Sequence, residues 1–83
     1  MNMNEARQLI ISCLDQVKLL TPADLDHLST NQDADIELSS LPIDSLKVVD
    51  LCMALEDALN RDIDVEVLIE NSSVNKLATF FTR

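Results

Sequence analysis

The chain has 83 residues, of which 47% are hydrophobic, so it is long enough for one small core. It contains no glycine, which excludes the glycine-rich phosphate loops of nucleotide-binding folds and disfavours hairpins that need glycine turns. Fifteen acids against six lysines and arginines give a net charge of −9, so neither nucleic acid nor an anionic membrane is an expected ligand. An aliphatic chain without glycine predicts helices joined by polar loops.

The first predicted helix spans about residues 3–20. Its apolar residues recur at steps of three and four and fill one face, which consists of Ala6, Leu9, Ile10, Cys13, Leu14, Val17 and Leu20. Arg7, Asp15 and Lys18 lie outside this face. The helix should stop near Thr21 and Pro22, because proline biases the residue before it away from helical backbone.

A short turn and a long loop are predicted next. Thr21 as a cap and Pro22 in the first helical position favour a short turn through Leu25 and Leu28. From residue 29 to 44 poor helix formers dominate, so we expect a polar connection. Its apolar residues should fold back onto the core: Ile36, Leu38, Leu41 and Ile43.

The second predicted helix begins at Asp44 and Ser45, runs to about Asn60 and carries two apolar stripes. The wider stripe should face the core and consists of Val48, Leu51, Cys52, Leu55 and Leu59. The narrower stripe is flanked by carboxylates and consists of Leu46, Val49 and Met53, with Asp50 and Asp57 on one side and Glu56 on the other. An exposed apolar strip bordered by acids is typical of a transient docking surface for basic partners.

The last third predicts two short helices, which makes the chain all-α. One covers about residues 64–70, with Val65, Leu68 and Ile69 expected to point inward. The other begins at residues 72–73, and its inner face should consist of Val74, Leu77, Ala78 and Phe81.

Catalytic and metal chemistry are poorly supported. His27 is the only histidine, and nothing in the sequence places it near a serine or cysteine, so we expect it in a surface turn. Cys13 and Cys52 fall among apolar helix residues and are expected to be buried free thiols. Neither a signal peptide nor a membrane-spanning run is visible, so the cytoplasm is the expected compartment. No metal site is predicted, because the turn glycine of calcium loops is missing among the alternating acids Asp33, Asp35 and Glu37.

Ser45 lies where the long loop gives way to the most regular predicted helix. The first amides of a helix are unpaired, and its N-terminus carries partial positive charge, so a phosphate attached to the Ser45 oxygen would be stabilised there. Taken alone, however, an Asp-Ser pair at this place is explained as a simple helix cap.

The stretch from Leu41 to Asp62 resembles the carrier motif of acyl carrier proteins, which reads Leu-Gly-x-Asp-Ser-Leu before an acidic helix. This chain reads Leu41-Pro42-Ile43-Asp44-Ser45-Leu46, and the order of helices and the chain length are similar too. The resemblance implies one acyl carrier domain over residues 1–83, a small four-helix bundle with a long first loop and a short third helix. Pro42 replaces the usual glycine and Lys47 replaces a common acid, which suggests a specialised pathway.

The resemblance also implies roles for individual residues. Ser45 matches the serine that receives covalent 4′-phosphopantetheine from coenzyme A through a magnesium-dependent phosphopantetheinyl transferase, and Asp44 matches the acid that caps the helix and is read by that transferase. Partner enzymes would contact Leu46, Lys47, Val49, Asp50, Met53, Glu56 and Asp57. The acyl pocket would be walled by Val48, Cys52, Leu55, Ile63 and Leu68.

The function expected from this resemblance is that of a monomeric acyl carrier protein, not an enzyme. It would hold acyl groups as thioesters and deliver them to loading, synthase and transferase enzymes with basic docking patches, in fatty-acid, polyketide or related biosynthesis. Two alternatives stay open: an aminoacyl or peptidyl carrier, and an acidic helical adaptor that is never modified.

Overall fold

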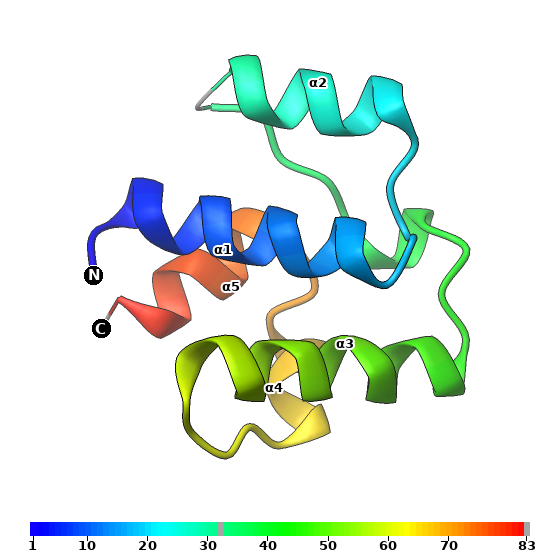
Figure 1. The fold of residues 1–83 in the computed structure, drawn as a ribbon, viewed down its shortest axis with the longest axis vertical. Helices are drawn as coiled ribbons and strands as arrows, with labels where there is room; N and C mark the ends of the chain where they lie inside the picture. The colour runs from blue at the N-terminus through cyan, green and yellow to red at the C-terminus, as the bar shows by residue number, and fades with distance from the viewer. Residues whose placement is uncertain (32, 83) are drawn as a thin grey trace.

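The computed structural model describes residues 1–31 and 33–82, and within them the chain is helical, as predicted. The elements in chain order are α1 (Met3–Gln16), α2 (Pro22–Thr30), the 3-10 helix η1 (Leu38–Ser40), α3 (Ser45–Leu59), α4 (Val65–Glu70) and α5 (Val74–Phe81). Helix α1 is central, because it packs against α2, α3 and α5, while α4 packs against α3 (Figure 1).

Each α-helix begins at a polar side chain that accepts a hydrogen bond from an amide two or three residues later. The capping residues are Asn2, Thr21, Asp44, Asp64 and Ser73. Such caps pair amides that would otherwise lack a partner in the first turn. The predicted starts of α3, α4 and α5 are therefore confirmed.

The predicted helix over residues 3–20 is too long, because a left-handed residue ends α1 early. Lys18 has φ 61°, and its N–H donates to the Asp15 carbonyl at 3.0 Å. The N–H of Leu19 donates to the Leu14 carbonyl, also at 3.0 Å. These two bonds form a Schellman motif, in which glycine is the usual left-handed residue. In a chain without glycine, lysine takes that position.

Helix α2 replaces the short turn that was predicted after Thr21. Thr21 and Asp24 form a capping box, and the helix continues to Thr30. His27 is exposed as expected, but on this helix rather than in a loop turn. The prediction placed the cap and Pro22 correctly but gave the segment only a short turn, because it did not use Asp24, the third residue after the cap, which completes the capping box.

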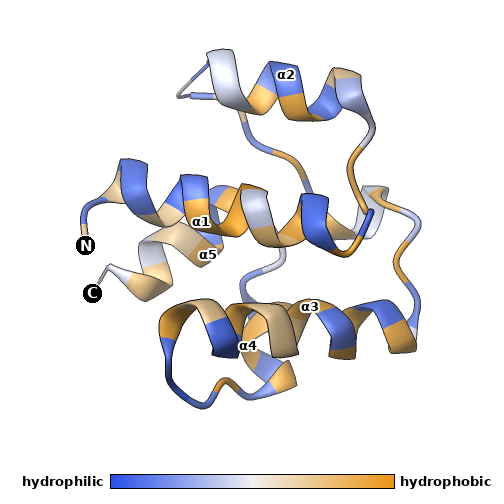
Figure 2. Cartoon of the chain, viewed as in Figure 1, coloured by the Kyte–Doolittle hydropathy of each residue, from blue (hydrophilic) through white to orange (hydrophobic). Residues whose placement is uncertain are grey.

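The core is mostly aliphatic, with Phe81 as a buried aromatic, and α1, α3 and α5 contribute most of it. Figure 2 shows that apolar and polar residues alternate along these helices. The loop before α3 folds onto this core as predicted, since Leu38 and Leu41 are buried and Ile36 and Ile43 are half-buried. The Leu38 N–H donates to the Ser72 carbonyl at 2.8 Å and ties the loop to the start of α5.

Arg7 lies outside the predicted apolar face of α1, and yet only 5% of it is exposed, because its guanidinium bonds to α5 and to the loop after α2. One prediction of burial is wrong. Ile69 was expected to point inward, but it is 67% exposed. It follows the buried Leu68 by about 100° around the short α4, which turns it to solvent.

Across residues 1–31 and 33–82, none of the helices combines the length and the apolar character that a membrane crossing requires.

Candidate functional site

Ser45 is the first residue of α3 and is exposed. The start of α3 follows the long loop and lies close to the end of α1 (Figure 1). The structure therefore places the Ser45 hydroxyl at the N-terminal end of α3, as the sequence predicted.

The first turn of α3 keeps two amide donors beside this hydroxyl. The Asp44 carboxylate accepts the Lys47 N–H at 2.9 Å, and the Asp44 carbonyl accepts the Val48 N–H at 2.9 Å. Within the described part of the chain, no protein group accepts the N–H of Ser45 or of Leu46. Two such donors at the positive end of a 15-residue helix are suited to an anion attached at Ser45.

Pro42 fits the approach to Ser45 without strain. Leu41 has extended backbone, with φ −90° and ψ 159°, which is the conformation that a residue before proline prefers. Among the described residues only Lys18 and Asn60 have positive φ, so position 42 does not require glycine. Leu41 is buried and Ile43 half-buried, and they anchor the loop on both sides of Pro42.

An exposed apolar strip runs along α3 from this site. Leu46 is 74% exposed, Met53 61% and Val49 44%, and the carboxylates Asp50 and Asp57 beside them are exposed as well. The arrangement matches the strip that the sequence predicted, while contact of these residues with partner enzymes stays a prediction. The sequence reasoning missed Ile69 of α4 as a further exposed apolar residue.

Lys47 and Glu56 differ from the other predicted docking residues, because their charged ends are bonded within the protein. The Lys47 ammonium donates to the Val17 carbonyl at the end of α1, at 2.9 Å. A Glu56 carboxylate oxygen accepts the Ile63 N–H, also at 2.9 Å. Both side chains are half-buried.

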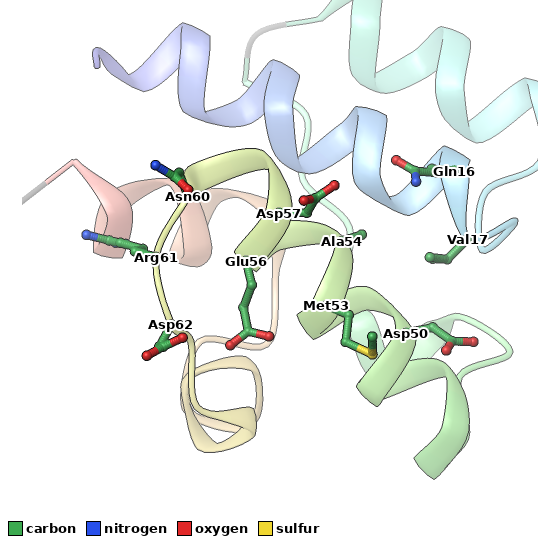
Figure 3. A pocket seen from close by; sticks show the side chains of 10 residues that line it. All are labelled: Gln16, Val17, Asp50, Met53, Ala54, Glu56, Asp57, Asn60, Arg61 and Asp62. Carbon is green, nitrogen blue, oxygen red and sulfur yellow. The ribbon is translucent and has the colours of Figure 1, made fainter.

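A groove of about 740 Å³ lies beside α3 (Figure 3). Asp57 points toward α1 and Gln16, whereas Glu56 points toward the α3–α4 loop and Asp62. The groove is lined by Gln16, Val17, Asp50, Met53, Ala54, Glu56, Asp57, Asn60, Arg61 and Asp62. Sequence reasoning missed the contributions of α1 and of residues 60–62, since helix periodicity does not show which segment packs beside α3.

The predicted acyl-pocket residues belong to the packed core. Cys52, Leu55, Ile63 and Leu68 are buried, and Val48 packs against them half-buried. The Cys52 thiol donates to the Ile63 carbonyl at 3.0 Å, so the backbone N–H and the backbone carbonyl of Ile63 are both bonded to side chains of α3. Entry of an acyl chain among these residues stays a prediction.

Cys13 and Cys52 are buried free thiols, as expected. Burial raises the pKa of both, and nearby carboxylates raise it further: Asp57 for Cys13, and Glu56 and Asp64 for Cys52. A raised pKa keeps a thiol protonated and weakly nucleophilic. Across the described residues, no three His, Cys, Asp or Glu side chains are grouped so as to hold a metal ion.

The comparison with protein families agrees with this geometry. The family model described as a phosphopantetheine attachment site matches residues 19–81, which include α2 to α5. The chain belongs to this family. A carrier domain of this family holds 4′-phosphopantetheine covalently and is not itself catalytic. The comparisons with curated proteins and with solved structures gave no significant match.

Membership of the phosphopantetheine attachment site family also implies interaction with a phosphopantetheinyl transferase and with biosynthetic enzymes. The carrier's described residues fit the group, because an exposed hydroxyl lies beside two amide donors at the start of α3.

Proposed function

We propose that this carrier is an acyl carrier protein that bears its 4′-phosphopantetheine arm on Ser45 and works in the cytoplasm in fatty-acid, polyketide or related biosynthesis. The observation that carries the proposal is the exposed Ser45 hydroxyl beside two amides without protein partners at the positive end of α3. Asp44 supports it, because its cap fixes the turn that presents the hydroxyl.

In the modification step, the Ser45 oxygen forms a bond to the phosphorus that bears the pantetheine of coenzyme A. The pyrophosphate link breaks, adenosine 3′,5′-bisphosphate leaves, and the hydroxyl proton passes to a base of the transferase. The chain contributes the exposed position of the oxygen and the α3 amides, which stabilise the negative phosphodiester that remains. When attached, the arm supplies a terminal thiol that carries the acyl group as a thioester.

Partner enzymes dock, in this proposal, on the exposed strip of α3. Leu46, Val49 and Met53 provide apolar contact, and Asp50 and Asp57 attract basic patches. Glu56 adds a carboxylate to the groove beside the strip. Lys47 is omitted from this set, because its ammonium is bonded to α1.

Two other functions are weighed against this one. An aminoacyl or peptidyl carrier would use the same serine, but the acidic α3 and the aspartate before Ser45 favour the acyl class by resemblance. An unmodified acidic adaptor would share the charge and the fold, and it would differ only in that Ser45 carries nothing.

The proposal is tested by incubating the purified chain with coenzyme A and a broad-specificity phosphopantetheinyl transferase and recording the intact mass. We expect one added phosphopantetheine group on the native protein and none on Ser45→Ala. The matched control is Ser39→Ala, which removes another exposed serine and should leave the gain unchanged. An unmodified native protein would support the adaptor instead. The mass of the group found on protein isolated from its own cells separates acyl from aminoacyl cargo.

A further inference from the structure

The side chain of Lys47 joins two helix ends that are far apart in the sequence. Its ammonium donates to the Val17 carbonyl at 2.9 Å, across a separation of 30 residues, and the side chain is half-buried. Val17 is the residue at which α1 ends, just before the left-handed Lys18. The contact therefore fixes the beginning of α3 against the end of α1.

Helix electrostatics explain why a lysine is tolerated at this position. Lys47 lies in the first turn of α3, where the positive end of the helix dipole disfavours a cation. The carbonyls in the last turn of α1 are the negative end of that helix and favour one. By reaching Val17, the ammonium leaves the unfavourable helix end and binds the favourable one.

The same residue also closes the cap of α3. Its backbone N–H donates to the Asp44 carboxylate at 2.9 Å. The backbone of Lys47 is therefore bonded to the residue before Ser45, while its side chain is bonded to the end of α1. Residues two apart on a helix point about 200° away from each other. Lys47 is thus directed to α1, where its ammonium is bonded to the Val17 carbonyl, while Ser45 points to a different side of α3.

We propose that Lys47 is a positioning residue for the modification of Ser45: it holds the start of α3 on α1 and so fixes where the transferase meets the hydroxyl. This inference rests on the proposed function. It differs from direct docking, in which the lysine charge would touch a partner enzyme. The α1 helix is a firm support, since Ile10 and Leu14 in it are fully buried.

The first test is the kinetics of phosphopantetheine transfer to the native chain, Lys47→Met, Lys47→Arg and Lys76→Met, at low and high salt. We expect Lys47→Met to lower kcat by about three- to tenfold with little change in KM, because a displaced hydroxyl slows reaction within the complex. The loss should be equal at both salt concentrations, since the broken contact lies within the protein. Lys47→Arg should recover part of the rate, because a guanidinium also donates to a carbonyl.

Lys76→Met is the matched control, because it removes the same charge from an exposed site on α5 and should leave both constants unchanged. An unchanged kcat in Lys47→Met would overturn the inference. So would a change confined to KM that disappears at high salt, which is the signature of direct docking.

A second measurement does not depend on the modification. Amide hydrogen exchange of the unmodified chain should be faster in Lys47→Met at the end of α1 and the start of α3, and unchanged in α5. Equal exchange in both proteins would show that Lys47 does not hold the end of α1 and the start of α3 together. If the native chain gains no arm at all, the proposed function fails, while exchange still decides whether Lys47 holds the two helix ends together.

Discussion

The thiols of Cys13 and Cys52 are held protonated by their surroundings. Burial is the larger cause and neighbouring carboxylates the smaller one, and both raise the pKa above its ordinary value of 9.0. Above that pH the unfolded thiols lose their protons while the folded ones keep them. The folded state then binds more protons, so the free energy of unfolding falls as the pH rises from 9.0 toward the raised folded pKa.

This prediction is checked by urea unfolding of the native chain and the double variant Cys13→Ala, Cys52→Ala, from neutral pH to about pH 10. Other titrating groups are common to both proteins, so the difference in pH dependence isolates the thiols. We expect the native chain to lose more stability over this range than the variant. Equal losses would show that the thiols ionise as easily in the folded protein as in the unfolded one.

Residues whose role follows from local chemistry were predictable. The cap at Asp44 and the exposed Ser45 follow from the chemistry of a helix start, and the structure confirms both. The contacts of Arg7 and Lys47 were not predictable. The partners of Arg7 lie 24 to 68 residues away in the sequence, and the partner of Lys47 lies 30 residues away. Only the folded chain shows that Ala34, Asn75 and Val17 lie within reach of these two cations.

Helix α3 presents the proposed docking surface, and its charges provide a test. Reversal of Asp50 and Asp57 to lysine should weaken binding to a phosphopantetheinyl transferase, and by more at low salt than at high salt. Salt screens the attraction between exposed charges, so a loss of binding that is larger at low salt indicates that these carboxylates act electrostatically. Dissociation constants measured at two salt concentrations check the prediction.

The matched control reverses Asp26 and Asp33, which are also exposed but lie on α2 and in the loop after it. This pair changes the net charge by the same amount. If the two double variants weaken binding by the same factor, the transferase responds to the net charge of the protein, and α3 is not the docking surface. Unchanged binding in the α3 pair at both salt concentrations would contradict the proposal outright.

At the scale of elements, sequence patterns located a helix best where a cap and a long apolar face coincide. Helix α3 has both, and its predicted span agrees with Ser45–Leu59. Helix α2 has a weak apolar face with Leu28 as its one buried residue, and α1 ends at a lysine in a glycine-like conformation. The six-residue α4 is too short for periodicity to set its register, which is why Ile69 was placed inward.

The whole molecule is held together in part by one buried cation. The Arg7 guanidinium on α1 donates to the Asn75 side chain on α5 at 2.7 Å and to the Ala34 carbonyl in the loop at 2.6 Å. Three segments of the chain therefore meet at one side chain. Its removal leaves the part-buried Asn75 Oδ1 without its donor and leaves the Ala34 carbonyl with only the Asn75 side-chain amide at 3.3 Å. The loss costs about 1–3 kcal/mol.

We therefore expect Arg7→Met to lower the free energy of unfolding by about 1–3 kcal/mol in urea titrations. Arg61→Met serves as the control, because Arg61 is exposed and its guanidinium lies over the Phe81 ring at 5.2 Å. An exposed contact of this kind contributes about 0.5–1 kcal/mol. If the two variants unfold at the same urea concentration, Arg7 does not join the three segments as described.

The central claim is that Ser45 carries the arm, and locating the added mass tests it most directly. The chain is modified with coenzyme A and a phosphopantetheinyl transferase, and the product is fragmented in a mass spectrometer. We predict that the phosphopantetheine group is found on Ser45 alone and that Ser45→Ala gains nothing. A group located on any other residue, or an equal gain by Ser45→Ala, would contradict the account.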